Sequence, residues 1–188
     1  GRVARAAGVP YFIDAAQAVG QLPIDVAAVG CDVLSGAGRK ALRGPRGTGL
    51  LYVRRAFLPR LTPTFVDTYS APLGADGHPQ LRDDAARFES AEASLALRCG
   101  LANALREALD IGLDAIRARI DTIARTLRRE LAAIDGIEVL DQGRERSGLV
   151  SFNLAGHDAA AVQRALAAQG IIIGSNGVPY TPLDMHAR

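Results

Sequence analysis

Two short apolar runs in the first part of this 188-residue chain constrain its fold more than any other feature. "VPYFIDA" at residues 9–15 and "CDVLS" at 31–35 are typical of buried parallel strands, and "PIDVAAVG" at 23–30 is typical of a short helix between them. "GTGLLYVRR" at 47–55 predicts a third strand. Strand, helix and strand at this spacing predict an α/β layer built on a mostly parallel sheet.

A stretch rich in Pro, Gly and polar residues at 65–84 predicts a long surface loop. Beyond it, apolar residues recur every three or four positions from Leu105 to Ile134, which predicts a helical stripe that is broken near Gly112 into two helices. Arginines and acids fill the opposite face, and this mixture favours a solvated helix surface over a nucleic-acid site. The arginines of this face are Arg117, Arg119, Arg125, Arg128 and Arg129.

The last part of the chain predicts a compact α+β unit. The pattern indicates strands at 136–141 and 148–156, a helix at 157–170 and a strand at 171–175. Because the predicted elements change from strand–helix–strand to long helices, we expect a domain change near residue 95.

Charge and composition exclude several classes of function. The formal net charge is +2, so no overall field indicates nucleic acid or a membrane surface, and the longest apolar run, "GIIIG", is too short to span a bilayer. Cys31 and Cys99 lie far apart and the three histidines lack ligand spacing, so neither a disulfide framework nor a metal site is expected. Free thiols favour a reducing compartment. Because the chain starts without a methionine, we expect it to be part of a longer protein.

Lys40 is the only lysine among 22 Lys and Arg residues, and it lies in "GAGRK", directly after the second predicted strand. A Schiff base requires a primary amine, and arginine cannot supply one because it stays protonated at any relevant pH. The pattern therefore indicates amine chemistry at Lys40, with a chance surface lysine as the alternative.

Asp14 ends the first predicted strand in "YFIDAAQ", and Gln17 follows one turn later. An acid at the carboxyl edge of a parallel sheet points into the crevice where α/β folds bind ligands. The alternative is an aspartate that caps a turn or a helix. Together with Lys40, Asp14 supplies the two protein groups that pyridoxal phosphate (PLP) chemistry needs, namely a lysine amine and an acid against the pyridine nitrogen.

The segment "DAAQAVGQLPIDVAAVGCDVLSGAGRKALRGPRGTGLLYVRR" resembles the active-site segment of the class V aminotransferases, a family of fold-type-I PLP-dependent enzymes that includes the cysteine desulfurases. "RFESAEASLALRCGLANAL", "GLVSFNLAG" and "TPLDMHAR" resemble the region that follows, so the resemblance covers essentially the whole chain. It implies that residues 1–95 are the C-terminal part of a large PLP-binding α/β domain, and that residues 96–188 are a truncated small α+β domain.

The same resemblance implies roles for five residues. Lys40 would form the Schiff base with PLP and shuttle the Cα proton, Asp14 would pair with the pyridinium nitrogen, and Gln17 would hydrogen-bond the phenolic oxygen. Ser35 lines the approach to Lys40, and the Arg39 guanidinium would meet the cofactor phosphate or the substrate.

Two departures from the family pattern concern the cofactor phosphate. Family members often place Ser or Thr three residues before the lysine, on the phosphate, whereas this chain has Ala37. One hydroxyl donor is therefore missing, and we expect weaker phosphate affinity. Many members also offer a Gly-Thr pair to the neighbouring subunit's phosphate after "RFE", where this chain has Ala91 and Glu92.

The function that the resemblance implies is an aminotransferase-like, PLP-dependent transformation of an amino acid. Desulfurases carry a nucleophilic cysteine at a position that aligns with Pro179, and neither Cys31 nor Cys99 is placed to attack a substrate sulfur. A desulfurase that uses a cysteine persulfide is therefore disfavoured, whereas aminotransfer, epimerisation and β-elimination need only Lys40 and the cofactor and stay open. Two alternatives stay open, a PLP-dependent sulfur lyase or cysteine desulfurase-like enzyme, and a non-catalytic relative that keeps the fold.

The resemblance also implies a homodimer that acts on a small amino-acid substrate. The free thiols favour a cytoplasmic location, and the charge and the short apolar runs argue against nucleic acid or a membrane as a partner. By the same resemblance, the aromatic that stacks on the cofactor ring precedes this chain, and the arginine for the substrate carboxylate follows it. We therefore expect these 188 residues alone to bind the cofactor poorly and to turn over little.

Overall fold

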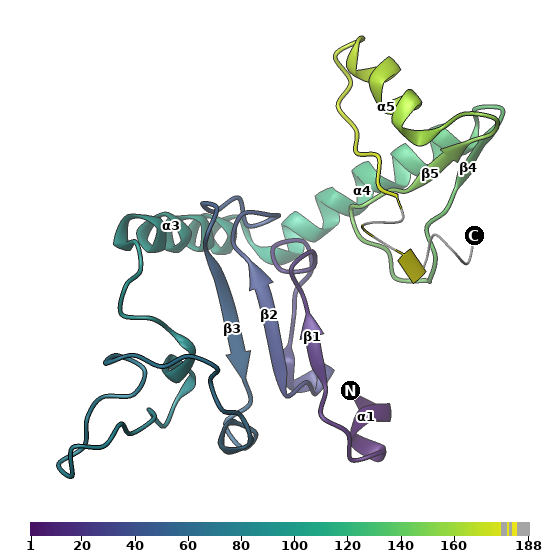
Figure 1. Cartoon of the computed structure of the whole chain (residues 1–188). Helices are drawn as coiled ribbons and strands as arrows, with labels where there is room; N and C mark the ends of the chain where they lie inside the picture. Colours follow the sequence, from purple (N-terminus) through teal and green to yellow (C-terminus); the bar gives the residue numbers. More distant parts are fainter. Residues whose placement is uncertain (178–179, 181, 184–188) are drawn as a thin grey trace. The chain divides into compact units, whose positions relative to one another are not determined.

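The computed structural model describes residues 1–177, 180 and 182–183, and the chain divides into two compact units, Gly1–Arg119 and Ile120–Arg188. Figure 1 shows the three-stranded sheet of the first unit and the two-stranded sheet of the second. The division between the units falls inside a long helix, and the domain change expected near residue 95 stays a prediction.

The first unit is built on a sheet with the strand order β1-β2-β3, where β1 is Phe12–Asp14, β2 is Val33–Ala37 and β3 is Gly49–Val53. A short helix α1, Arg2–Ala6, precedes the sheet. Strands β1 and β2 are parallel because helix α2, Val26–Val29, carries the chain back between them. Asp25 caps this helix by accepting from the Ala27 and Ala28 amides, and Gly30 ends it in the left-handed conformation.

The pairing of β2 with β3 is antiparallel, although the sequence predicts a mostly parallel sheet. The link between these strands, residues 38–48, contains no helix and is too short for a parallel crossover. The sheet described here therefore has one parallel and one antiparallel pairing.

The core of the first unit lies around Ala15, Cys31 and Leu34, which are at most 3% exposed. Half-buried apolar side chains pack against them, among them Ile13 of β1, Val19 after β1 and Leu50 of β3. Cys31 is thus a buried core residue, whereas Cys99 is exposed on a helix, and both thiols are free.

Between β3 and the long helices, the chain forms two 3₁₀ turns, Leu58–Arg60 and Ala85–Phe88, and the predicted long loop. Asp67 organises this loop, because its carboxylate accepts from the backbone amides of Tyr69, Ser70 and Ala91. The Arg82 guanidinium stacks on the Tyr69 ring at 4.4 Å from its centroid.

Helices α3, Leu95–Ile111, and α4, Leu113–Ala132, confirm the predicted helical stripe. They are separated at Gly112, whose φ of 89° is a conformation that only glycine adopts readily, so the predicted break is also confirmed. One expectation for α4 is wrong. Arg128 does not belong to the solvated face, since it is only 8% exposed and its guanidinium pairs with Asp141.

The second unit contains the antiparallel strands β4, Ile137–Val139, and β5, Phe152–Leu154, and helix α5, Ala159–Ala167. Asp158 caps α5 by accepting from the Ala161 amide. The strand predicted at 171–175 is not formed. This segment is held by side-chain bonds instead, because Gln163 of α5 donates to the Ile173 carbonyl oxygen at 3.0 Å and accepts from the Ser175 hydroxyl at 2.8 Å.

Candidate active site

Asp14 is the last residue of β1, and it lies directly opposite Ser35 in the parallel pairing with β2. The Ala15 amide donates to the Ser35 carbonyl oxygen at 2.8 Å, which fixes this register immediately beyond Asp14. The Asp14 side chain is exposed, and its Oδ1 accepts from the Ala16 amide at 2.9 Å. Asp14 therefore caps the turn that follows β1, as the alternative interpretation expects, and also lies at the carboxyl edge of the sheet.

Lys40 lies in a closed loop of residues 38–44, which we call the Lys40 loop. The Gly44 amide donates to the Gly38 carbonyl oxygen at 2.8 Å and closes the loop, and the Gly38 amide donates to the Thr48 carbonyl oxygen at 2.9 Å. Inside the loop, the Arg43 amide donates to the Lys40 carbonyl oxygen at 2.8 Å, with Arg43 in the left-handed region at φ 60°. Main-chain bonds thus define the position of Lys40 without using its side chain.

The Lys40 loop contacts the segment that follows Asp14. Gly20, which is buried and has a φ of 90°, lies so close to this loop that an added Cβ would stand 2.7 Å from the Leu42 amide nitrogen and 2.8 Å from the Ala41 carbonyl carbon. Strands β1 and β2 are parallel, so their carboxyl ends lie at the same edge of the sheet. Asp14 ends β1 at that edge, Lys40 lies three residues after the end of β2, and Gln17 lies in the turn that follows Asp14.

The other candidate residues differ in exposure. Lys40 and Ser35 are half-buried, whereas Gln17 and Arg39 are exposed. The backbone carbonyl of Gln17 accepts from the Gln21 side chain at 2.8 Å, a bond that does not involve the side-chain amide of Gln17. Among the described residues, none forms a hydrogen bond or ion pair with the Lys40 or Arg39 side chain.

The structure describes three of the positions that depart from the family pattern. Ala37 is the last residue of β2 and pairs with Gly49 of β3. The Ala91 amide donates to Asp67 Oδ2 at 2.7 Å, and Glu92 is exposed. Pro179, the position that aligns with the desulfurase cysteine, lies outside the described residues.

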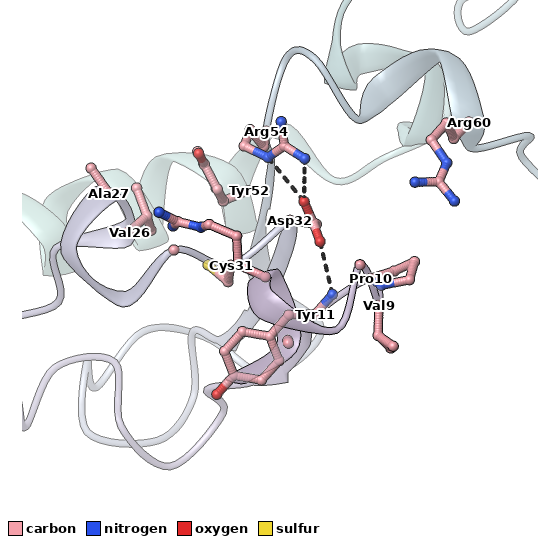
Figure 2. A pocket seen from close by; sticks show the side chains of 14 residues that line it. Val9, Pro10, Tyr11, Val26, Ala27, Cys31, Asp32, Tyr52, Arg54 and Arg60 are labelled. Carbon is pink, nitrogen blue, oxygen red and sulfur yellow. Dashed lines mark hydrogen bonds and ion pairs between the residues drawn. The ribbon is translucent and has the colours of Figure 1, made fainter. Parts of the chain in front are cut away.

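A hollow of about 470 Å³ lies at the opposite edge of the sheet, where β1 and β2 begin. Figure 2 shows Asp32 in this hollow between Tyr11 and Arg54. Asp32 accepts from the Tyr11 amide at 2.8 Å and from Arg54 Nε at 2.9 Å. The Tyr11 amide, followed by the Arg54 side chain, lowers the pKa of Asp32 below its ordinary value. These contacts join the starts of β1 and β2 to the end of β3, so they brace the sheet far from Lys40.

Sequence reasoning misses the residues that hold the Lys40 loop in place. Gly20, Thr48 and Leu101 all contact this loop, yet none carries a reactive group that would draw attention in the sequence. The glycine-rich "GPRGTG" run, which contains Thr48, indicates close approach of the backbone to another element, but it does not identify Gly20 or Leu101 as that element.

Two classes of site are not found in the part of the chain that the structure describes. No three or more His, Cys, Asp or Glu residues gather there in a way that could hold a metal ion. No helix in the same residues has both the length and the apolar character needed to cross a membrane.

Asp14 ends β1 and Lys40 follows the adjacent parallel strand β2, so both lie at the carboxyl edge of the sheet, which is where α/β folds bind ligands. The family model of the class V aminotransferases matches residues 1–183, and the chain belongs to this family. The family and the fold class expected from the sequence are thereby confirmed.

Individual relatives agree with this assignment. A probable cysteine desulfurase of Methanothermobacter thermautotrophicus is 31% identical over 167 residues, which cover 88% of this chain and 42% of that protein. A variant of C-DES with glycine covalently linked to its PLP cofactor aligns with a TM-score of 0.82 at 28% identity, covering 89% of this chain and 44% of that structure. The cystine C–S lyase C-DES in complex with its reaction product, cysteine persulfide, aligns with a TM-score of 0.81 at 29% identity over 89% of this chain and 45% of that structure. The chain therefore spans less than half the length of these relatives.

Proposed function

We propose that this chain forms the lysine-bearing part of a PLP-dependent enzyme that transforms an amino acid in the manner of an aminotransferase. The proposal rests on one observation. Asp14 and Lys40 lie at the same carboxyl edge of the β1–β2 pair, where the segment after Asp14 contacts the Lys40 loop. Family membership supports PLP as the cofactor, as does the PLP-linked relative of the same fold.

The donor set of this edge fits PLP. Lys40 offers a primary amine whose side chain has no ion-pair partner among the described residues, and Asp14 offers an exposed carboxylate. We propose that Lys40 binds the cofactor covalently through Nζ and moves the substrate's Cα proton, and that Asp14 pairs with the ring nitrogen. Bound there, the cofactor supplies an electron sink for the substrate carbon.

Three further residues complete the proposed cofactor site. Gln17 would donate its side-chain amide to the ring oxygen, and Ser35, opposite Asp14, would line the approach to Lys40. Arg39 is exposed beside Lys40 and would bring a guanidinium to the phosphate, where Ala37 has no hydroxyl to offer.

A second candidate is cleavage of a carbon–sulfur bond. Among the compared structures, C-DES is described as a cystine C–S lyase with cysteine persulfide as its product, and it shares the fold of this chain. Such a reaction uses the same lysine and acid and releases a persulfide instead of transferring the amino group. A non-catalytic relative that retains the fold is the third possibility, and the absent hydroxyl at Ala37 favours it.

The assembly and location are also proposals. We propose a homodimer, on the family resemblance, with a small amino acid as substrate. A cytoplasmic location is supported by the two free thiols, Cys31 and Cys99.

The deciding experiment is reduction with borohydride of the intact protein supplied with PLP, followed by peptide mapping. Lys40 is the only lysine in these 188 residues, so a PLP adduct on a lysine of this segment must lie at Lys40. Lys40→Arg should lose both the adduct and turnover. Arg46→Lys, which places a second lysine on an exposed position just beyond the Lys40 loop, is the matched control. In this variant Lys40 should carry the adduct and position 46 should not.

The outcomes separate the candidates. Failure of the wild-type protein to form the Lys40 adduct would contradict the catalytic proposal and favour the non-catalytic relative. With the adduct formed, incubation with an amino acid and a 2-oxo acid tests amino transfer, whereas persulfide or sulfide release from cystine or cysteine identifies the lyase.

A further inference from the structure

The Lys40 loop has glycine at both ends, and the same side chain lies against both of them. A Cβ built on Gly38 would stand 2.9 Å from Leu101 Cδ1, and a Cβ built on Gly44 would stand 3.0 Å from the same atom. These distances are shorter than ordinary carbon–carbon contact, so the Leu101 side chain occupies part of the space that a larger residue at Gly38 or Gly44 would need, and the Thr48 hydroxyl lies beside it at Gly38.

Helix α3, which carries Leu101, lies close against the chain that follows the loop (Figure 1). Gly100 makes this approach possible, because a Cβ on Gly100 would stand 2.6 Å from Pro45 Cγ. The Thr48 hydroxyl donates to the Pro45 carbonyl oxygen at 2.6 Å and fixes the same turn. Leu101 therefore projects from a rigid element onto the point where the loop closes.

The loop is supported on a second side by Gly20, at Ala41 and Leu42. Leu42 is 4% exposed, so the second half of the loop is anchored in the interior. Leu101 supports the two ends of the loop, which are also the two partners of its closing hydrogen bond. Between these anchors lie Arg39 and Lys40, whose side chains form no hydrogen bond or ion pair with any residue that the structure describes.

We propose that Leu101 is a positioning residue for Lys40. It holds the closing bond between Gly38 and Gly44, and through that bond it sets the place from which Nζ reaches the reacting atoms. The proposal rests on the proposed function of Lys40. Displacement of a catalytic group by about 1 Å is enough to lower a rate about a hundredfold, so a contact of this kind acts on turnover without touching the substrate.

The test compares Leu101→Ala with Leu101→Met, which keeps the side-chain volume, and with Leu109→Ala, an exposed position on the same helix. Hydrogen exchange of the cofactor-free intact protein is the first readout. Leu101→Ala should accelerate exchange in residues 38–48 by about tenfold and leave residues 120–132 unchanged, because only the loop loses its support. Leu101→Met and Leu109→Ala should exchange as the wild type does.

Steady-state kinetics are the second readout. Leu101→Ala should lower kcat about tenfold to a hundredfold with little change in KM, and Leu101→Met should restore most of kcat. Unchanged exchange in residues 38–48, or a kcat equal to that of the wild type, would overturn the proposal. If Leu101→Ala does not fold, Leu101→Val, which removes less volume, carries the same two measurements with a smaller expected effect.

The failure of this inference is distinguishable from failure of the proposed function. Absence of a borohydride-fixed adduct on Lys40 in the wild-type protein removes the proposed function. An intact wild-type adduct together with an unaffected Leu101→Ala variant removes only the role of Leu101.

Discussion

Asp14 and Ser35 face each other across the parallel pairing of β1 and β2, and the amide directly after Asp14 bonds to the Ser35 carbonyl oxygen. The register places Asp14 as the last paired residue of β1, so its side chain leaves the sheet at the edge from which the Lys40 loop also departs. A slip by one residue would turn Asp14 to the other face of the sheet. The position of the acid therefore depends on the pairing of the two strands.

Asp14→Asn should lower kcat/KM about tenfold to a hundredfold, because the neutral amide cannot provide the charge-assisted bond to a protonated ring nitrogen. The fold should survive, since the Asn oxygen can still accept from the Ala16 amide as Asp14 does. Steady-state kinetics and circular dichroism of the intact protein measure the two effects. Asp25→Asn, at the cap of α2, is the control and should leave kcat/KM unchanged. A fully active Asp14→Asn variant contradicts the proposed role.

Ala37→Ser should tighten PLP binding by up to about tenfold, because a hydroxyl at this position would add one donor to the phosphate. Ala37 ends β2 opposite Gly49, and serine at this position keeps the backbone pairing of the two strands. Titration of the cofactor-free protein with PLP, followed by absorbance, gives the dissociation constant. Ala41→Ser, four residues later in the Lys40 loop, should have no such effect. Equal affinity in the wild type and in Ala37→Ser would show that the phosphate lies elsewhere.

Asp32→Asn should lower the melting temperature of the protein near neutral pH. The pKa of Asp32 is lowered in the fold by the Tyr11 amide and by Arg54. The stabilisation by this carboxylate is therefore present above its unfolded pKa of about 3.9, and it is lost as the pH falls through the lower folded pKa. Melting curves from pH 7 to pH 2 should show the wild type and the variant converging only in acid. Asp83→Asn, an exposed acid, is the control, and a constant gap at all pH values would count against this assignment.

Asp67→Asn should loosen the long loop between β3 and α3. Its two carboxylate oxygens accept from amides on both sides of the loop, Oδ1 from Ser70 and Oδ2 from Ala91, and these bonds hold its pKa well below the usual range. Asparagine has one acceptor oxygen and loses one side of this connection. Limited proteolysis should cut residues 65–93 faster in the variant. Asp76→Asn, at a carboxylate that accepts from the nearby His78 amide, should be cut at the wild-type rate.

The sequence predicts those features of the fold that depend on residues close together in the chain. The three strands of the first unit, the break at Gly112 and the α5 helix all follow from periodicity and glycine placement. The sequence alone also suggests the candidate site, because Lys40 is chemically unusual in a chain of arginines and follows a recognisable strand.

The remaining features depend on contacts between distant segments. Residues 171–175 have the apolar pattern of a strand, but Gln163 holds them by side-chain bonds, and the pattern does not reveal the partner. The contact of Leu101 with Gly38 and Gly44 joins positions more than fifty residues apart in the sequence, so only the folded structure shows it.

Arg128→Ala should destabilise the second unit by about 3 kcal/mol, because removal of one partner leaves a buried charge uncompensated. Arg128 Nε donates to Asp141, and its Nη2 donates at 2.8 Å to the Ser147 and Leu149 carbonyl oxygens. One side chain of α4 thus holds the segment between β4 and β5 in place. Arg129→Ala is the matched control, since the neighbouring Arg129 is exposed and its ion pair among the described residues is with Glu130. Its loss should cost less than about 1 kcal/mol. Urea unfolding of the intact protein, monitored by hydrogen exchange in residues 137–154, resolves the two variants. Equal stability of both would show that Arg128 behaves as one more arginine of a solvated helix face, as the sequence pattern alone predicts.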